Sequence, residues 1–176
     1  MTPPIENDWT LREAGPADVE ALALVGAATF LDTFAWRLDG AALVAHCRRS
    51  HSPAFYRDAL AAGARGWLAE AATGGAPIGF ALAGQPNIEG MKDGDVELKR
   101  IYSLSRWHGT GVGPALLQTV LEEYADAPRV ILGVFNENER AIRFYRKHGF
   151  VQVATRQFDV GGTLYDDVVL AREWVG

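Results

Sequence analysis

The chain has a single cysteine, Cys47, among its 176 residues. One cysteine cannot form an intramolecular disulfide, and no second cysteine stands at a spacing typical of metal sites. His46 and His51 lie nearby in the sequence, but no fourth ligand accompanies them, so we expect no zinc or other metal site. The cysteine content is that of a protein from a reducing compartment, and we expect a cytoplasmic location.

Long apolar runs and dense basic segments are also missing. The longest uncharged run, residues 71–88, is interrupted by glycines and prolines and cannot form a membrane helix. The first eight residues lack the basic and apolar regions of a signal peptide. Seventeen Lys and Arg stand against 22 Asp and Glu, and no segment is basic enough to follow a phosphate backbone. We therefore expect neither membrane nor nucleic-acid binding.

What is present is the composition of an ordinary globular protein, with 48% hydrophobic and 22% charged residues. These values exclude collagen-like, coiled-coil and disordered chains. A chain of this length can bury a sufficient core in one domain, and no internal repeat or low-complexity linker divides it. We predict a single domain over residues 1–176.

The spacing of apolar residues predicts an α/β fold. A β-period or a short apolar run predicts strands over residues 9–14, 65–72, 76–84, 95–104, 129–135, 150–160 and 163–171. A helical period predicts helices from Asp18 to near Asp32, over 39–49 and 53–62, from the glycines near 111 to Pro128, and over 138–148. Alternation along residues 95–104 places Glu97, Ile101 and Ser103 on one face of their strand. The expected result is a mixed sheet flanked by helices.

The segment from His108 to Gly113, HGTGVG, lies between an expected strand and an expected helix. Glycines let backbone N–H groups approach an anion closely, and a helix N-terminus adds roughly half a positive charge at the same point. The pattern favours a pyrophosphate site, although a plain strand-to-helix turn needs similar residues. No lysine follows the glycines, which excludes a P-loop, and the next strand ends in Asn136 rather than an acid, which disfavours a dinucleotide site.

Two further motifs narrow the choice. Residues 97–102, ELKRIY, precede the glycines, and residues 138–150, NERAIRFYRKHGF, follow them after one helix and one strand. Over residues 96–150 the chain resembles the GNAT N-acetyltransferase superfamily, and the first motif is most similar to its diamine and polyamine branch. The resemblance implies a mostly antiparallel sheet of about seven strands, with two splayed parallel strands that form an acetyl-CoA site.

The resemblance also implies roles for single residues. Backbone near Ile101 and Ser103 would pair with the pantetheine arm, Asn138 would orient the cofactor, and Tyr145 would face the thioester sulfur. The pyrophosphate would meet His108, Gly109, Thr110, Gly111, Val112 and Gly113. The family has Gln or Arg where this chain has His108, so that side-chain contact departs from the pattern.

Acetylation of an amine needs a proton acceptor and a proton donor. A primary amine with a pKa near 10.4 is almost wholly protonated at pH 7, and removing the proton costs roughly 4.6 kcal/mol. Glu97 is the candidate base, and the phenol of Tyr145 is the candidate acid for the departing thiolate. No cysteine lies in the motifs, so we expect direct attack within a ternary complex. The structural alternatives are a surface ion pair of Glu97 with Lys99 or Arg100, core packing for Tyr145 and helix capping for Asn138.

The acceptor is the part that the sequence determines least. Phe30, Phe34 and Trp36 are explained first by core packing and second as a substrate-pocket wall beside Glu97. We expect a small-molecule primary amine, with a polyamine as one option. Acetylation of a protein or peptide and a non-catalytic acyl-CoA-binding module are the alternatives. The oligomeric state stays open, a homodimer included.

Overall fold

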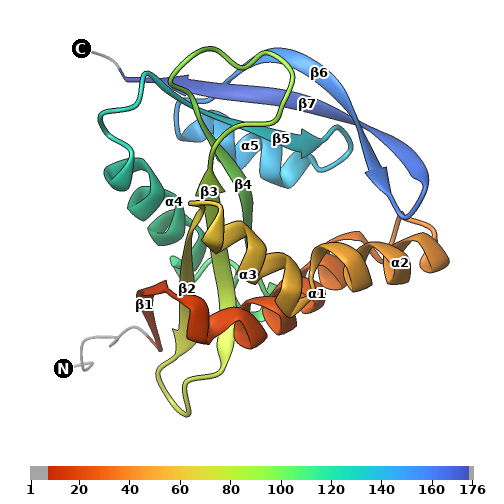
Figure 1. Cartoon of the computed structure of the whole chain (residues 1–176), viewed down its shortest axis with the longest axis vertical. Coiled ribbons are helices and arrows are strands. Elements are labelled where there is room, and N and C mark those ends of the chain that lie inside the picture. Colours follow the sequence, from red (N-terminus) through yellow and green to blue (C-terminus); the bar gives the residue numbers. More distant parts are fainter. Residues whose placement is uncertain (1–7, 175–176) are drawn as a thin grey trace.

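The computed structural model describes residues 8–174, which form one seven-stranded sheet with helices on both faces (Figure 1). The strands are β1 (Trp9–Ala14), β2 (Arg65–Ala71), β3 (Pro77–Gly84), β4 (Val96–Ser103), β5 (Arg129–Phe135), β6 (Val151–Val160) and β7 (Thr163–Glu173). Their order in the sheet is β1-β2-β3-β4-β5-β7-β6, and each pair is antiparallel except β4 with β5. The predicted mixed, mostly antiparallel α/β sheet is confirmed.

Five α-helices cover the sheet in the described chain: α1 (Val19–Phe34), α2 (Gly40–Ser50), α3 (Pro53–Ala61), α4 (Val112–Glu123) and α5 (Glu139–Lys147). Leu22 on α1 and Tyr56 on α3 pack with Phe80 on one face of the sheet, whereas Leu116 on α4 and Tyr145 on α5 pack with Leu132 on the other. Figure 1 shows α1, α2 and α3 gathered on one side of the molecule. Side chains that alternate along the strands therefore enter two separate cores.

Two helix ends differ from the expected positions by more than one residue. Helix α1 continues to Phe34, past Asp32, and α4 ends at Glu123 rather than at Pro128. After α4 the chain makes a turn in which Ala127 N donates to Tyr124 O, so Pro128 belongs to the connection into β5. No helix of the described residues is long and apolar enough to cross a membrane.

Strand β4 contains a β-bulge at its centre. Leu82 of β3 pairs with Arg100, but the next residue, Ala83, pairs with Leu98, so Lys99 is the extra residue on β4. An extra residue reverses the alternation of side chains between the two halves of a strand.

The bulge corrects one prediction from the sequence. Leu98 and Ile101 both pack toward the core beneath α4, and Glu97 precedes Leu98 in the strand, so Glu97 points to the opposite face. Ser103 shares the face of Ile101. The expectation that Glu97, Ile101 and Ser103 share one face is therefore wrong, because it assumed unbroken alternation.

Strands β4 and β5 are paired at one end only. Their parallel pairs are Val96 with Val130 and Glu97 with Ile131, and no later pair follows. On the outer sides, β4 stays paired with β3 as far as Ser103 and β5 stays paired with β7 to its end. The carboxyl-terminal halves of the two strands thus separate within a continuous sheet, which confirms the predicted splayed pair.

Candidate active site

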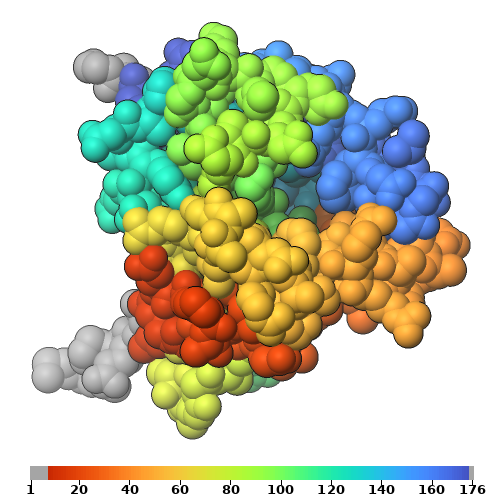
Figure 2. Space-filling view, in the orientation of Figure 1, coloured from red at the N-terminus to blue at the C-terminus, as the bar shows by residue number. Residues whose placement is uncertain are grey.

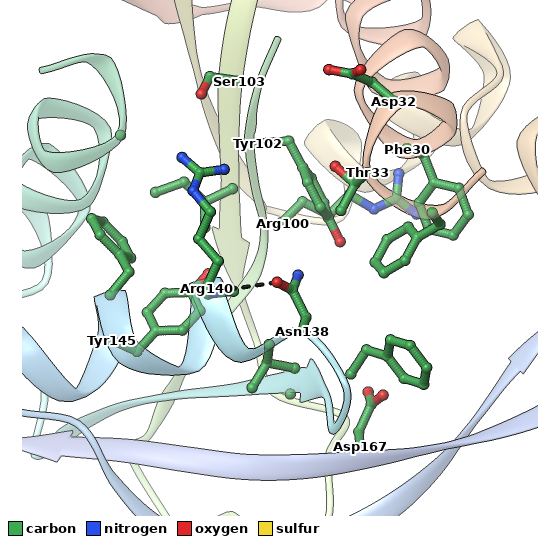
Figure 3. Close-up of a pocket in the computed structure, with 18 of the residues that line it drawn as sticks. Phe30, Asp32, Thr33, Arg100, Tyr102, Ser103, Asn138, Arg140, Tyr145 and Asp167 are labelled. Carbon is green, nitrogen blue, oxygen red and sulfur yellow. Dashed lines mark hydrogen bonds between the residues drawn. The ribbon is translucent and has the colours of Figure 1, made fainter. Parts of the chain in front are cut away.

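A cavity of about 1100 Å³ opens where β4 and β5 separate. We call one part of its wall the loop side, formed by Ile101, Ser103, His108, Gly111, Gly113 and Tyr145, and another part the aromatic side, formed by Phe30, Phe34, Phe55, Tyr102, Phe158 and Tyr165. Figure 3 shows Ser103, Arg140 and Tyr145 across the cavity from Phe30, Thr33 and Asp167. Figure 2 shows the surface hollowed between the orange region of α2 and α3 and the blue region of β6 and β7.

The glycine loop meets the cavity mainly through its backbone. Gly109 has φ +79° and Gly111, the N-cap of α4, has φ +94°, a left-handed conformation that favours glycine. The Thr110 hydroxyl donates to Trp107 O at 2.7 Å, and Val112 is fully buried in the core. Of the six predicted loop residues, His108, Gly109, Gly111 and Gly113 line the cavity, whereas Thr110 and Val112 do not.

His108 connects the loop to the end of β4. Its Nε2 lies 3.0 Å from Ser103 O and 3.2 Å from Nη1 of Arg140. Burial, and then the charge of Arg140, lower the pKa of His108, against the opposing effect of the hydrogen bond to Ser103. The imidazole therefore fixes the loop against the strand that forms the floor of the cavity.

Helix α5 brings Asn138 and Tyr145 to the cavity on one face, since they are two turns apart. Asn138 Oδ1 accepts from Ala141 N at 3.2 Å, so it caps the helix as the structural alternative predicted (Figure 3). The ring of Tyr145 packs against Phe144 and Phe150. Its hydroxyl makes no hydrogen bond within the described residues, and burial raises its pKa, so the phenol stays protonated at neutral pH.

Glu97 is buried at the edge of the cavity, with 6% of its surface exposed. Its Oε2 accepts from Asn87 N at 2.9 Å and from Lys99 Nζ at 3.0 Å. The predicted ion pair with Lys99 is present, and one with Arg100 is not found among residues 8–174. Both donors use Oε2, and Oε1 accepts no hydrogen bond within residues 8–174.

Comparison with known proteins decides the family. Residues 30–150 match the model of the acetyltransferase (GNAT) family. The chain belongs to this family. An uncharacterized N-acetyltransferase of Mycobacterium tuberculosis is 48% identical over 85 residues, which are 47% of this chain and 54% of that protein. The spermine/spermidine N(1)-acetyltransferase of Bacillus subtilis is 35% identical over 78 residues, 42% of this chain and 51% of that protein.

The chain thus spans about half the length of the curated relatives that it matches. Its fold is similar to that of the PaiA N-acetyltransferase of Thermoplasma acidophilum, solved in complex with coenzyme A. That match has a TM-score of 0.75 and 18% identity, and it covers 94% of this chain and 99% of the other. At this identity the similarity establishes the GNAT fold and nothing finer.

The aromatic residues predicted for this GNAT protein divide into two groups. Phe30 and Phe34 are buried, their ring centroids are 4.6 Å apart, and they line the cavity, so they serve as core and wall together. Trp36 is 67% exposed and donates from Nε1 to Thr33 O at 3.0 Å. The expectation of core packing is therefore wrong for Trp36, which lies at the cavity rim.

A second buried carboxylate, Asp167 of β7, was missed from the sequence. It lines the cavity and accepts from Nε of Arg156 at 3.1 Å. Burial raises its pKa, against the opposing charge of Arg156. The available signal was an acid directly before an apolar strand segment, residues 168–171. Arg100, a half-buried residue that lines the cavity, was missed as well. Within residues 8–174 no group of three or more His, Cys, Asp or Glu side chains is placed to hold a metal ion.

Proposed function

We propose that this chain transfers an acetyl group from acetyl-CoA to a primary amine of a small molecule, by direct attack within a ternary complex. The observation that carries this proposal is the cavity itself, which has a glycine loop and helix N-terminus on one side and aromatic walls on the other. Family membership and the N-acetyltransferase relatives support it. The cytoplasmic location, the homodimer and the absence of a metal stay predictions.

The loop side fits a CoA molecule. The first-turn N–H groups of α4 have no intrahelical acceptor, and Gly111 and Gly113 present no side chain that would keep a pyrophosphate away from them. Beyond Glu97, the edge of β4 that faces β5 has no strand partner, so backbone at Ile101 and Ser103 can pair with amides of the pantetheine arm. When bound, acetyl-CoA supplies an acetyl group activated as a thioester.

The chain's own residues would then move two protons. Glu97 Oε1 takes a proton from the ammonium, directly or through a water, and the Tyr145 hydroxyl gives a proton to the departing sulfur. The bulge at Lys99 places Glu97 on the face opposite Ile101, toward the aromatic side, whereas Tyr145 lies on the loop side. Base and acid are thus separated in the way that an acceptor and a donor molecule on opposite sides require.

The test of acetyl transfer is thiol release from acetyl-CoA with a panel of amines, amino acids, polyamines, aminoglycosides and peptides. We expect release with small amines. Release with peptides only would replace the small-molecule acceptor with a peptide. CoA binding without release in any mixture would favour the non-catalytic acyl-CoA-binding module.

The cofactor site is tested best at Gly113. Gly111 requires a positive φ, so a substitution there strains the backbone whatever else it does. At Gly113 a Cβ would meet only the Phe144 ring, with Cζ at 3.9 Å and Cε2 at 4.0 Å, and φ is ordinary, so Gly113→Leu should fold and block the approach of a pyrophosphate. We expect calorimetry to show at least about a tenfold loss of CoA affinity, since one charge-assisted hydrogen bond contributes that much.

The matched control is Gly40→Leu at the start of α2, where a Cβ meets nothing within 4 Å. This variant should bind CoA with unchanged affinity. Unchanged affinity in a folded Gly113→Leu protein would remove the glycine loop from the proposed cofactor site.

A further inference from the structure

Arg100 differs from the other cations around the aromatic side of the cavity. Lys99 pairs with Glu97 at 3.0 Å, and Arg156 pairs with Asp167 at 3.1 Å. Arg100 also lines the cavity, but no carboxylate among residues 8–174 lies within ion-pair distance of it. A guanidinium is always charged, so this side of the cavity carries a half-buried cation that the chain does not neutralise.

Neutral groups hold this cation in one orientation. Arg100 Nη1 donates to Ser50 O at the end of α2 and to the Tyr56 hydroxyl at 2.9 Å. The guanidinium carbon lies 4.2 Å from the centroid of the Phe55 ring. Nε and Nη2 have no acceptor within the described residues, so three N–H groups of the fork are left for a ligand.

His51 adds a second unpartnered donor beside Arg100. Its Nδ1 lies 2.9 Å from the Tyr56 hydroxyl oxygen and 3.4 Å from Arg100 Nη1, which can only donate. Nδ1 therefore accepts, and the ring proton lies on Nε2. Only 4% of His51 is exposed, it lines the cavity, and Nε2 has no hydrogen-bond partner in the part of the chain described.

The imidazoles beside Arg100 do not add charge. Burial, and then the charge of Arg100, lower the pKa of His51 to about 2 and that of His46 to about 4. His46 Nδ1 is also buried without a partner, and its ring stacks on Phe30 at 4.4 Å. A buried polar atom without a partner costs free energy, so these unpaired groups indicate a binding partner from outside the chain.

From these groups we propose that the acceptor amine also carries a carboxylate, which binds the free N–H groups of Arg100 and Nε2–H of His51. The proposal rests on the proposed acetyl transfer and names its substrate class. Two coplanar oxygens match the guanidinium fork, and the aromatic walls would contact the chain between carboxylate and amine. A diamine or polyamine would instead bring a second ammonium toward Arg100, where like charges repel.

The test uses linear primary amines of matched length that end in a methyl, a carboxylate or a second ammonium group, with kcat and KM from thiol release. At the best length we expect the carboxylate series to exceed the methyl series by about 10- to 100-fold in kcat/KM, through KM, and the diammonium series to be the poorest. Equal rates, or a preference for the diammonium series, would overturn the proposal.

Substitution of Arg100 separates recognition from folding. Arg100→Gln should reduce the ratio of carboxylate to methyl kcat/KM to about one, and Arg100→Lys should restore part of it, since the charge returns without the fork. Arg57→Gln, an exposed position on α3, is the matched control and should keep the wild-type ratio. A folded Arg100→Gln protein that lowers both series equally would show a structural role only.

A measurement on the unmodified protein covers the case in which Arg100 variants do not fold. Alkanoates without an amine should inhibit competitively against the methyl-terminated amine, and alcohols of the same length should not. Absence of inhibition would contradict the carboxylate site. If the methyl series is acetylated without a carboxylate preference, only this inference fails. If no amine is acetylated although CoA binds, the proposed function fails and this inference fails with it.

Discussion

The two ends of the β4–β5 pair differ in whether their arginine has a carboxylate partner. At the paired end, Arg129 of β5 forms an ion pair with Asp95 at 2.6 Å, in which the side chains are 6% and 0% exposed, and it also donates to Gly90 O. At the splayed end, Arg100 of β4 lines the cavity without a carboxylate. Where the strands pair, the chain neutralises its own charge. Where they separate, it leaves donors that a ligand can use.

Backbone pairing explains this difference. The paired end, which we also call the closed end, is filled by apolar side chains such as Val130, Ile131 and Leu98. An unpaired charge there would have neither water nor a partner. The splayed end, which we also call the open end, borders a cavity of about 1100 Å³, in which water or substrate can solvate a charge. We therefore expect changes at the closed end to affect stability and changes at the open end to affect function.

The largest expected effect is on folding. Asp95→Asn leaves the buried Arg129 charge without its partner and should reduce the free energy of unfolding by about 3–5 kcal/mol, measured by urea denaturation. Glu13→Gln, which breaks the exposed pair with Arg65, is the control and should cost at most about 1 kcal/mol. Equal losses would mean that the closed end is not held by its ion pair.

The Asp95 pair also predicts how stability depends on pH. Burial alone would raise the pKa of Asp95, but hydrogen bonds from Arg129 and Lys92 N outweigh it and lower the pKa below the ordinary value of 3.8. A lowered pKa gives stability that is present above pH 4 and is lost as the pH falls through the folded-state pKa. Wild type should therefore lose more stability than Asp95→Asn between pH 5 and pH 2.

The next effect is on turnover at the open end. Tyr145→Phe removes the proposed proton donor and should lower kcat for thiol release by about 10²-fold. Stability should change little, because the ring and its packing against Phe144 and Phe150 are kept. Tyr124→Phe, near the end of α4, is the control and should leave kcat unchanged. Wild-type turnover in Tyr145→Phe would make Tyr145 a packing residue.

The smallest effect is expected at Glu97, which lies where the two ends meet. Glu97→Gln should lower the rate by about tenfold at neutral pH, less than the roughly 10²- to 10⁴-fold typical of a general base, because a water can replace it. Raising the pH should restore the rate, since the free amine becomes abundant. Glu122→Gln, an exposed position on α4, should follow the wild-type pH–rate profile. Parallel profiles for Glu97→Gln and wild type would exclude Glu97 as the base.

The sequence by itself determined the elements and the loop side of the site. Apolar spacing located the strands and helices to within a few residues, because each pattern reflects the repeat of its own backbone. Gly111 at the start of α4 and Asn138 at the start of α5 act within one turn of chain, where local geometry decides the conformation.

Only the tertiary structure decided the aromatic side of the cavity, where we propose that the acceptor amine binds. The bulge at Lys99 depends on how β4 pairs with β3, which no alternation within β4 records. Asp167 reaches the cavity because β7 lies between β5 and β6, and Arg100 meets His51 because α2 and α3 cover the same face. Contacts between residues distant in sequence depend on the free energy of the whole packed chain, so they had to be found in the fold.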